Sequence, residues 1–260
     1  MEQRITDQDV LPAETLALPR RGWRINPVKA VVVTGICWTG FAMMAWLVHH
    51  NRTTALDHTG LLFWRNAGDL TPIGSPMVLE ALRDMTALGG TLIMTMMVLA
   101  AITALLFLKL RREAFLLAIT AMTGTLVEVQ MKLWVGRARP EIVPHLTEAG
   151  GMSFPSGHSF NSAMIYIAIA LAFATMSARH SVRYTIVGVA IALSMLIATS
   201  RVWLGVHFPS DVIAGWLGGA GWAFLASALF FQPAKAAAES HAAEKLDVIT
   251  EKGRTAHQPQ

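Results

Sequence analysis

Residues 30–48 read AVVVTGICWTGFAMMAWLV, an uninterrupted run without a charged side chain. A helix of about 20 apolar residues crosses the roughly 30 Å hydrocarbon core of a bilayer, so this run predicts a membrane-spanning helix. A cleaved signal peptide is the alternative, but the run starts late and no small-x-small cleavage site follows it. We therefore expect this segment to stay in the membrane as an anchor.

Five further apolar stretches suggest that most of the chain lies in the membrane. The six predicted spans are Ala30 to Val48, about Thr86 to Leu108, Ala114 to about Val135, Ser159 to Ala178, Tyr184 to Ser200, and Val212 to Phe231. Glu128 and Lys132 interrupt the third span, and the fifth is short. The expected fold is all-α, a polytopic membrane helix bundle with six transmembrane helices.

The composition agrees with this class of protein. Hydrophobic residues make up 53% of the 260 positions and charged residues only 15%, and the mean hydropathy is +0.46, outside the usual range of soluble globular chains. The single cysteine, Cys37, excludes an internal disulfide and a thiolate zinc cluster. The net charge of +4 does not indicate nucleic acid, because the basic residues cluster in short segments between apolar runs.

The basic residues also predict the orientation of the chain, because cytoplasmic loops retain positive charge. They gather before the first span and between alternate pairs of spans, at Arg4, Arg20, Arg21, Arg24, Lys29, Lys109, Arg111, Arg112, Arg179 and Arg183. Both termini are therefore expected in the cytoplasm. Segments 49–85, 132–158 and 201–211 are expected on the opposite side.

No internal repeat or linker divides the chain, so a single domain is expected. Residues 29–231 would form the six-span domain, between a cytoplasmic N-terminal tail, 1–28, and a cytoplasmic C-terminal tail, 232–260. The tails are polar or alanine-rich and are expected to be poorly ordered. Segment 49–85 mixes aromatic and charged residues, which predicts either a short amphipathic helix along the interface or an ordinary loop.

The first polar group on the outward side follows the third span and reads Lys132-Leu-Trp-Val-Gly-Arg-Ala-Arg139-Pro140. Lysine offers a phosphate a point charge and arginine a bidentate fork, although both residues also snorkel at membrane edges. Their place on the side that is normally poor in positive charge favours a phosphate site. Glu128, one helical turn before Lys132, could hold its ammonium group in place.

The second polar group, Phe154-Pro155-Ser156-Gly157-His158-Ser159, stands immediately before the fourth span. Glycine permits close approach of the backbone to an anion, serine can cap the helix, and the first amides of the helix favour negative charge. An ordinary turn is the alternative. If the segment binds phosphate, it also presents an imidazole to it.

The third polar group, Ser200-Arg201-Val-Trp-Leu-Gly-Val-His207-Phe-Pro-Ser-Asp211, joins the fifth and sixth spans. A histidine and an aspartate four residues later can form a pair that fixes the tautomer of the ring and raises its nucleophilicity. The alternative is an interfacial histidine and a capping aspartate. Three such groups on one face, with no metal-ligand cluster, favour a common site.

Together the three groups resemble the signature of the type 2 phosphatidic acid phosphatase superfamily, which includes glucose-6-phosphatase and the vanadium haloperoxidases. That signature reads Lys-x6-Arg-Pro, Pro-Ser-Gly-His and Ser-Arg-x5-His-x3-Asp. It is complete here at Lys132 to Pro140, Pro155 to His158 and Ser200 to Asp211. The resemblance implies a haloperoxidase-like phosphatase core.

The resemblance also implies a role for each signature residue. Five residues would hold the phosphate: Lys132, Arg139, Ser156, Gly157 and Arg201. His207 would attack phosphorus to form a phosphohistidine, and Asp211 would orient its ring. His158 would protonate the leaving oxygen and then activate the water that hydrolyses the intermediate. Fixed cations would neutralise the phosphoryl charge, so no metal and no cofactor is expected.

The expected function is therefore that of a metal-independent membrane lipid phosphatase with its site on the non-cytoplasmic face of a bacterial inner membrane. Its expected partners are the membrane and a lipid phosphate, and no nucleic acid; the sequence predicts no oligomeric state. Substrates implied by the family are undecaprenyl pyrophosphate, phosphatidylglycerol phosphate, phosphatidic acid, diacylglycerol pyrophosphate and lipid A phosphates.

Other functions stay open at this point. A lipid A phosphatase or a lipid phosphotransferase would use the same residues. A vanadate-dependent haloperoxidase would share the anion cradle, but those relatives are soluble. A transporter would place its ionisable residues near the middle of the membrane, whereas here they gather at the ends of spans.

Overall fold

The computed structural model describes residues 26–174, 176 and 179–229, and in these residues the chain forms helices and no strands. The helices are α1 (Pro27–His49), α2 (Thr54–Leu62), α3 (Pro76–Ala87), α4 (Thr91–Phe107), α5 (Arg111–Val135), α6 (Gly157–Ala174), α7 (His180–Trp203) and α8 (Pro209–Leu229). The predicted all-α bundle is confirmed. Apart from residues 26–28, the tails predicted for 1–28 and 232–260 lie outside the described residues.

The helices support a membrane protein but do not confirm six spans. Within the described residues, α1, α5, α6 and α7 are long and apolar enough to cross a membrane, and α3 with α4 would make a fifth span. This pair is bent by 49°, so the predicted span from Thr86 to Leu108 is interrupted at Gly89 and Gly90. Helix α8 covers most of the sixth predicted span and carries Asp211 in its first turn, but it is not among the candidate spans found in the described residues.

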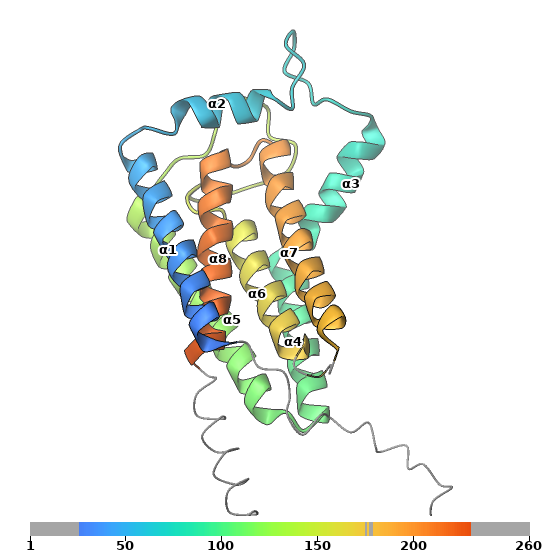
Figure 1. Ribbon diagram of the computed structural model, residues 1–260. Helices are drawn as coiled ribbons and strands as arrows, with labels where there is room; N and C mark the ends of the chain where they lie inside the picture. Colours follow the sequence, from blue (N-terminus) through green and yellow to red (C-terminus); the bar gives the residue numbers. More distant parts are fainter. Residues whose placement is uncertain (1–25, 175, 177–178, 230–260) are drawn as a thin grey trace, which may run out of the picture.

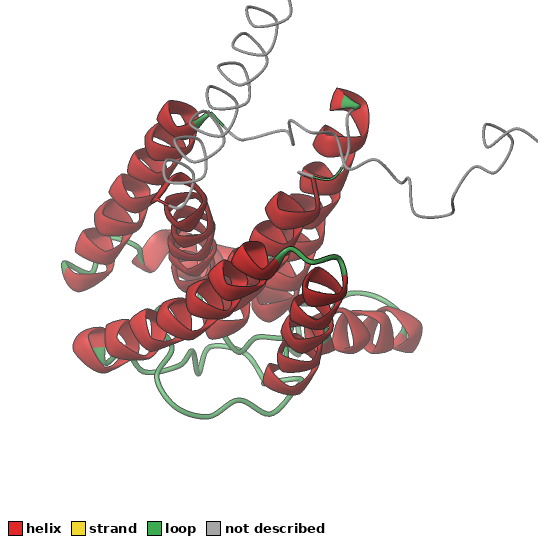
Figure 2. Cartoon of the chain, turned by 90° about the horizontal axis from the view of Figure 1, so that it is seen from below, coloured by secondary structure: helices red, strands yellow, loops and turns green. Residues whose placement is uncertain are grey.

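Helices α6 and α8 form the centre of the bundle and pack directly against each other (Figure 1). Helix α1 covers α8, while α7, α5 and α4 pack around α6. Figure 2 shows the helices of the bundle, in red, from below. A glycine makes the central contact close, because a Cβ added at Gly219 would collide with the backbone carbonyl of Phe160. The bundle core therefore depends on the absence of a side chain at this position.

The outer surface of the bundle is apolar, which is the reverse of a soluble protein. Large hydrophobic side chains are exposed on several helices, among them Val31, Ile36 and Trp46 on α1, Leu92 and Met96 on α4, and Phe115, Met122 and Leu126 on α5. A contiguous surface of this kind is stable when lipid covers it. The most apolar stretch of α6 is 61% buried, against 22% for α1, so α6 is the shielded helix of the bundle.

One end of the bundle is covered by α2, which crosses it almost at right angles to the other helices (Figure 1). The α5–α6 and α7–α8 connections lie beneath α2 in this view. Segment 49–85 thus contains two helices, α2 and the start of the bent pair, and is not an ordinary loop. Asp57 and Leu61 are the buried residues of α2, so the helix presses a carboxylate towards the connections below it.

Candidate active site

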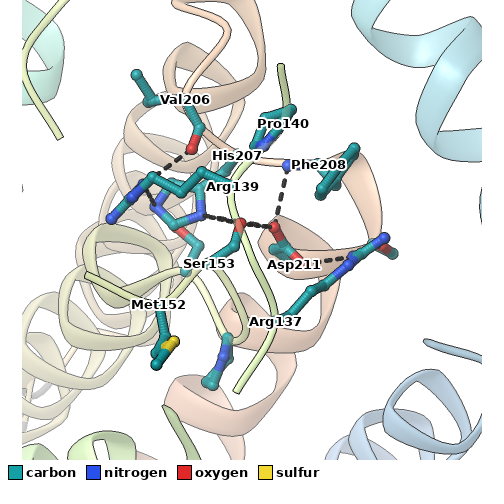
Figure 3. Close-up of polar contacts among 12 residues, drawn as sticks. Arg137, Arg139, Pro140, Met152, Ser153, Val206, His207, Phe208 and Asp211 are labelled. Carbon is teal, nitrogen blue, oxygen red and sulfur yellow. Dashed lines mark hydrogen bonds and ion pairs between the residues drawn. The ribbon is translucent and has the colours of Figure 1, made fainter. Parts of the chain in front are cut away.

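His207 lies in the short connection between α7 and α8 and is only 2% exposed. Its Nδ1 lies 3.6 Å from Oδ2 of Asp211, which is longer than a hydrogen bond. The hydroxyl of Ser153 fills this position, since it donates to Oδ2 of Asp211 and lies 3.4 Å from Nδ1 (Figure 3). The imidazole–carboxylate pair expected from the sequence is therefore present with a serine beside it.

The other ring nitrogen of His207 faces Arg139. Nη1 of Arg139 lies 3.0 Å from Nε2 of His207 and also donates to the carbonyl of Val206 at 2.8 Å (Figure 3). The carbonyls of Gly150 and Gly151 accept the remaining bonds of the guanidinium, at 2.6 and 3.1 Å. The α5–α6 connection thus holds a cation directly against the imidazole.

Lys132, in the last turn of α5, is fixed from two sides. Its ammonium group lies 3.2 Å from Glu128, so the ion pair expected from the sequence is present. It also donates to the carbonyls of Pro155 and Met152, at 2.7 and 3.2 Å. These bonds join the end of α5 to the turn that begins α6.

The turn before α6 combines a cap with a close backbone approach. The Ser156 hydroxyl accepts hydrogen bonds from the hydroxyl and the backbone amide of Ser159, at 2.8 and 3.4 Å, as expected of an N-cap serine. A Cβ added at Gly157 would lie 2.7 Å from Oε1 of Glu128, so glycine is what lets the chain pass over the ion pair. The amides at the start of α6 are thereby brought beside Lys132.

Arg201 and His158 complete the group. Arg201, 4% exposed, donates from Nη1 to the hydroxyl of Thr86 at 2.8 Å, while its Nε has no hydrogen-bond partner in the described part of the chain. The titratable groups close enough to influence His158 are Arg201, His207, Arg139 and Lys132. The three sequence motifs, separated along the chain, therefore meet at the end of the bundle under α2.

Burial controls the protonation of His207. It lowers the pKa of this imidazole to about 4, because the surrounding protein disfavours the charged form, and the nearby Arg139 and Arg201 act in the same direction. Asp211 opposes the shift by stabilising an imidazolium. The ring is consequently neutral at pH 7, as a nucleophile must be.

Sequence reasoning missed several polar residues that hold the site together. Arg137 donates to Asp211 and to Asp57 of α2, and Ser153 donates to Asp211. Ser210 bonds to both Arg137 and Asp57. Arg137 occupies one of the variable positions of the Lys-x6-Arg-Pro motif, and nothing in the pattern of segment 49–85 distinguishes Asp57.

Comparisons with known proteins place this geometry in a family. The family model of the PAP2 superfamily matches residues 112–234 of this chain. Phosphatidylglycerophosphatase B of Bacillus subtilis is 31% identical over 147 residues, which cover 55% of this chain and 70% of that protein. Lipid A 1-phosphatase of Rhizobium etli is 34% identical over 127 residues, 45% of this chain and 50% of that protein.

A solved structure extends the likeness beyond the motifs. It is the crystal structure of a transmembrane PAP2-type phosphatidylglycerolphosphate phosphatase from Bacillus subtilis, with a TM-score of 0.66 and 26% sequence identity. The superposition covers 77% of this chain and 93% of the other. The chain therefore belongs to the PAP2 superfamily and is an integral membrane phosphatase that acts on lipid phosphates.

Proposed function

We propose that this phosphatase transfers the phosphoryl group of its substrate first to Nε2 of His207 and then to water. In the first step the N–P bond forms, the P–O bond to the lipid breaks, and His158 gives its proton to the departing oxygen. In the second step His158 takes a proton from water, the water oxygen attacks phosphorus, and the P–N bond breaks. The products are the dephosphorylated lipid and inorganic phosphate, with both histidines restored.

The contact between Arg139 and Nε2 of His207 is the observation that carries this mechanism. It sets a phosphate-binding cation beside the nucleophilic atom, where it can meet the oxygens of a phosphoryl group as the N–P bond forms. The unsatisfied Nε of Arg201 supports a second such contact, since a buried donor without a partner is costly unless a ligand accepts from it.

Lys132 and the turn before α6 would complete the cradle. Lys132 supplies a third positive charge, and the backbone amides around Gly157 sit at the N-terminus of α6, where the helix dipole favours an anion. The Ser156 hydroxyl is already engaged as a cap. Its contribution would therefore be to hold these amides in place as well as to line the site.

The reaction requires no metal in this proposal. Phosphoryl transfer needs its equatorial charge neutralised, and Lys132, Arg139 and Arg201 can do so from fixed positions. In the described residues no group of three or more His, Cys, Asp or Glu side chains could hold a metal ion. Activity that survives a chelator would support this part of the proposal, and loss of activity that added metal restores would refute it.

We place the active site on the non-cytoplasmic face of a bacterial inner membrane. The basic clusters before α1, between α4 and α5, and between α6 and α7 support this orientation. Alkaline phosphatase fused after residue 148 would be active and the same reporter fused after residue 110 inactive. The reverse pattern would place the site in the cytoplasm.

The substrate we propose is a bacterial phospholipid with a terminal phosphate monoester, first of all phosphatidylglycerol phosphate. The names of the Bacillus subtilis relatives support this choice, while the likeness to lipid A 1-phosphatase makes lipid A the main competitor. Phosphatidic acid ends in the same phosphate monoester, while undecaprenyl pyrophosphate presents its terminal phosphoryl group on a phosphoanhydride. The apolar helix surfaces around the site allow such a lipid to enter from the bilayer.

Phosphate release by the purified protein tests the proposal. The four lipids would be presented in detergent micelles with and without EDTA, and His207→Gln would serve as the matched inactive protein. We expect release from phosphatidylglycerol phosphate to be fastest and the variant to lose about 10³-fold or more. Acid-labile, base-stable phosphate bound to the unaltered protein during turnover would identify the phosphohistidine, and full activity of His207→Gln would refute it.

A further inference from the structure

Arg137 is not a signature residue, yet its side chain makes several short polar contacts next to the site. Its guanidinium donates to Oδ1 of Asp211 at 2.6 Å, to Oδ2 of Asp57 at 2.7 Å and to the Ser210 hydroxyl at 2.7 Å. It also lies over the ring of Phe208, 4.0 Å from the centroid. Arg137 therefore joins Asp211 and the residue before it, Ser210, to α2.

Asp57 closes this network from the other direction. It is 2% exposed, and its Oδ1 accepts from the backbone amide of Ser210 at 3.0 Å. Its Oδ2 accepts from the Ser210 hydroxyl at 2.8 Å as well as from Arg137. Asp57 belongs to α2, outside the residues 112–234 that match the superfamily.

The network determines which oxygen of Asp211 faces the histidine. Arg137 occupies Oδ1, so Oδ2 is left to the Ser153 hydroxyl, the backbone amide of Phe208 and the nearby imidazole. A buried carboxylate held at both oxygens cannot rotate without losing charge-assisted bonds. The orientation of Asp211 is thus set by residues that do not touch the substrate site.

We propose that Asp57 and Arg137 form a positioning pair that holds Asp211 toward His207 and balances its charge. The proposal rests on the proposed function, because it assigns the pair a part in the histidine chemistry. One guanidinium stands between two carboxylates, so the set carries one net negative charge. Removing the cation or the outer anion changes that balance in opposite directions.

Because the two substitutions change the charge near His207 in opposite directions, they distinguish a positioning role from a merely structural one. The charged and titratable groups facing His207 are Asp211 from α8, Arg139 from the α5–α6 connection, Arg201 from α7 and His158 from α6. Against this constant background, loss of Arg137 leaves excess negative charge and favours the imidazolium. Loss of the negative charge of Asp57 does the reverse.

The experiment compares Arg137→Gln, Asp57→Asn and the double variant, with Glu80→Gln as the control. Glu80 is an exposed carboxylate of α3 that forms an ion pair with Arg83 on the same helix. The probe is dioctanoyl phosphatidic acid in detergent, with kcat and KM measured from pH 3 to 8. Thermal unfolding of each variant identifies any protein that has lost its fold.

We expect Arg137→Gln to lower kcat by roughly tenfold or more, with KM changed less than about twofold, because the pair touches Asp211 and not the phosphate. The acid limb of kcat/KM should move up in Arg137→Gln and down in Asp57→Asn, by roughly half a pH unit or more. The double variant should return toward the original limb and be more active than Arg137→Gln. Glu80→Gln should match the unaltered protein.

The proposal would be overturned if the acid limbs of Arg137→Gln and Asp57→Asn moved in the same direction. It would also be overturned if the double variant lost activity by the product of the two single-variant factors. If Arg137→Gln does not fold, Arg137→Lys takes its place, and it must keep the original limb because it keeps the charge. Failure of the proposed function would show instead as absence of phosphate release by the unaltered protein on every lipid tested. The two failures are therefore distinguishable.

Discussion

Nη1 of Arg139 donates a hydrogen bond to Nε2 of His207 across 3.0 Å. A guanidinium has donors only, so Nε2 must be the unprotonated nitrogen, and Nδ1 carries the hydrogen on the side of Ser153 and Asp211. This is the tautomer that attack from Nε2 requires. In the proposed mechanism Arg139 therefore turns from the ring to the phosphate oxygens as a substrate arrives, which makes it a natural target for mutation.

The first prediction concerns the shape of that cation. Arg139→Lys keeps the charge but replaces the planar fork with a single ammonium, which cannot reproduce the two-pronged contact with phosphate. We expect kcat/KM to fall by roughly 10- to 100-fold, as for the loss of a charge-assisted hydrogen bond. Arg111→Lys, at the opposite end of α5, is the control and should retain full activity. If Arg139→Lys were as active as the control, the two-pronged contact of the guanidinium with phosphate would not be needed for activity.

The second prediction concerns the leaving group. His158→Gln removes the proposed general acid, whose contribution is typically about 10²- to 10⁴-fold. The loss should be large for a phospholipid, whose alkoxide leaves poorly, and much smaller for p-nitrophenyl phosphate, whose phenolate needs no proton. The comparison requires kcat for both substrates with the same purified protein. Equal losses on the two substrates would show that His158 does not act as the acid.

The third prediction follows from the pKa of His207, which burial lowers to about 4. The folded protein binds this proton more weakly than the unfolded chain, whose histidine has a pKa of about 6.5. The stability contributed by the neutral ring is thus complete above pH 6.5 and is lost as the pH falls from 6.5 to 4. Melting temperatures measured in detergent should decline over this window, and less steeply in His207→Gln. Identical slopes would mean that the ring does not titrate as described.

The same shift governs activity in acid. The limb of kcat/KM that reports protonation of the free nucleophile should lie near pH 4, because the neutral ring persists to that point. Measurements from pH 3 to 8 on the folded protein would locate it. A limb near pH 6.5 would indicate that His207 is solvated during catalysis.

The fourth prediction addresses the packing of α6 on α8. Gly219→Ala adds a methyl group where the Phe160 carbonyl lies, and overpacking of this kind costs about 1–3 kcal/mol. Gly35→Ala is the matched control, because a Cβ at this α1 position meets nothing within 4 Å. The control should be neutral or more stable by up to about 1 kcal/mol. Equal melting temperatures for the two variants would argue against the close contact of these helices.

The signature residues could be found from the sequence because each motif keeps its chemistry within a few positions. His207 and Asp211 are four residues apart, so their proximity follows from local geometry alone. The helical class was also predictable from long apolar runs. The bend between α3 and α4 was not, because Gly89 and Gly90 sit within a sequence that remains apolar on the far side.

The residues that orient the site could not be found in this way. Asp57 and Arg137 are 80 positions apart, and they meet only because α2 crosses the end of the bundle. Ser153 lies in a connection without regular structure, where spacing along the chain says little about direction. Its bond to Asp211, 58 positions away, is likewise a product of the tertiary fold.

The crossing of α2 over the site limits how the enzyme can be dismantled or recombined. A fragment confined to residues 112–234 would contain the complete signature yet leave Arg137 without Asp57. Chimaeras between relatives would have to exchange residues 54–62 together with the α5–α6 and α7–α8 connections to keep Arg137 between Asp57 and Asp211. The set of residues that must be kept together for this site is thus larger than the signature, and it includes α2 from the first third of the chain.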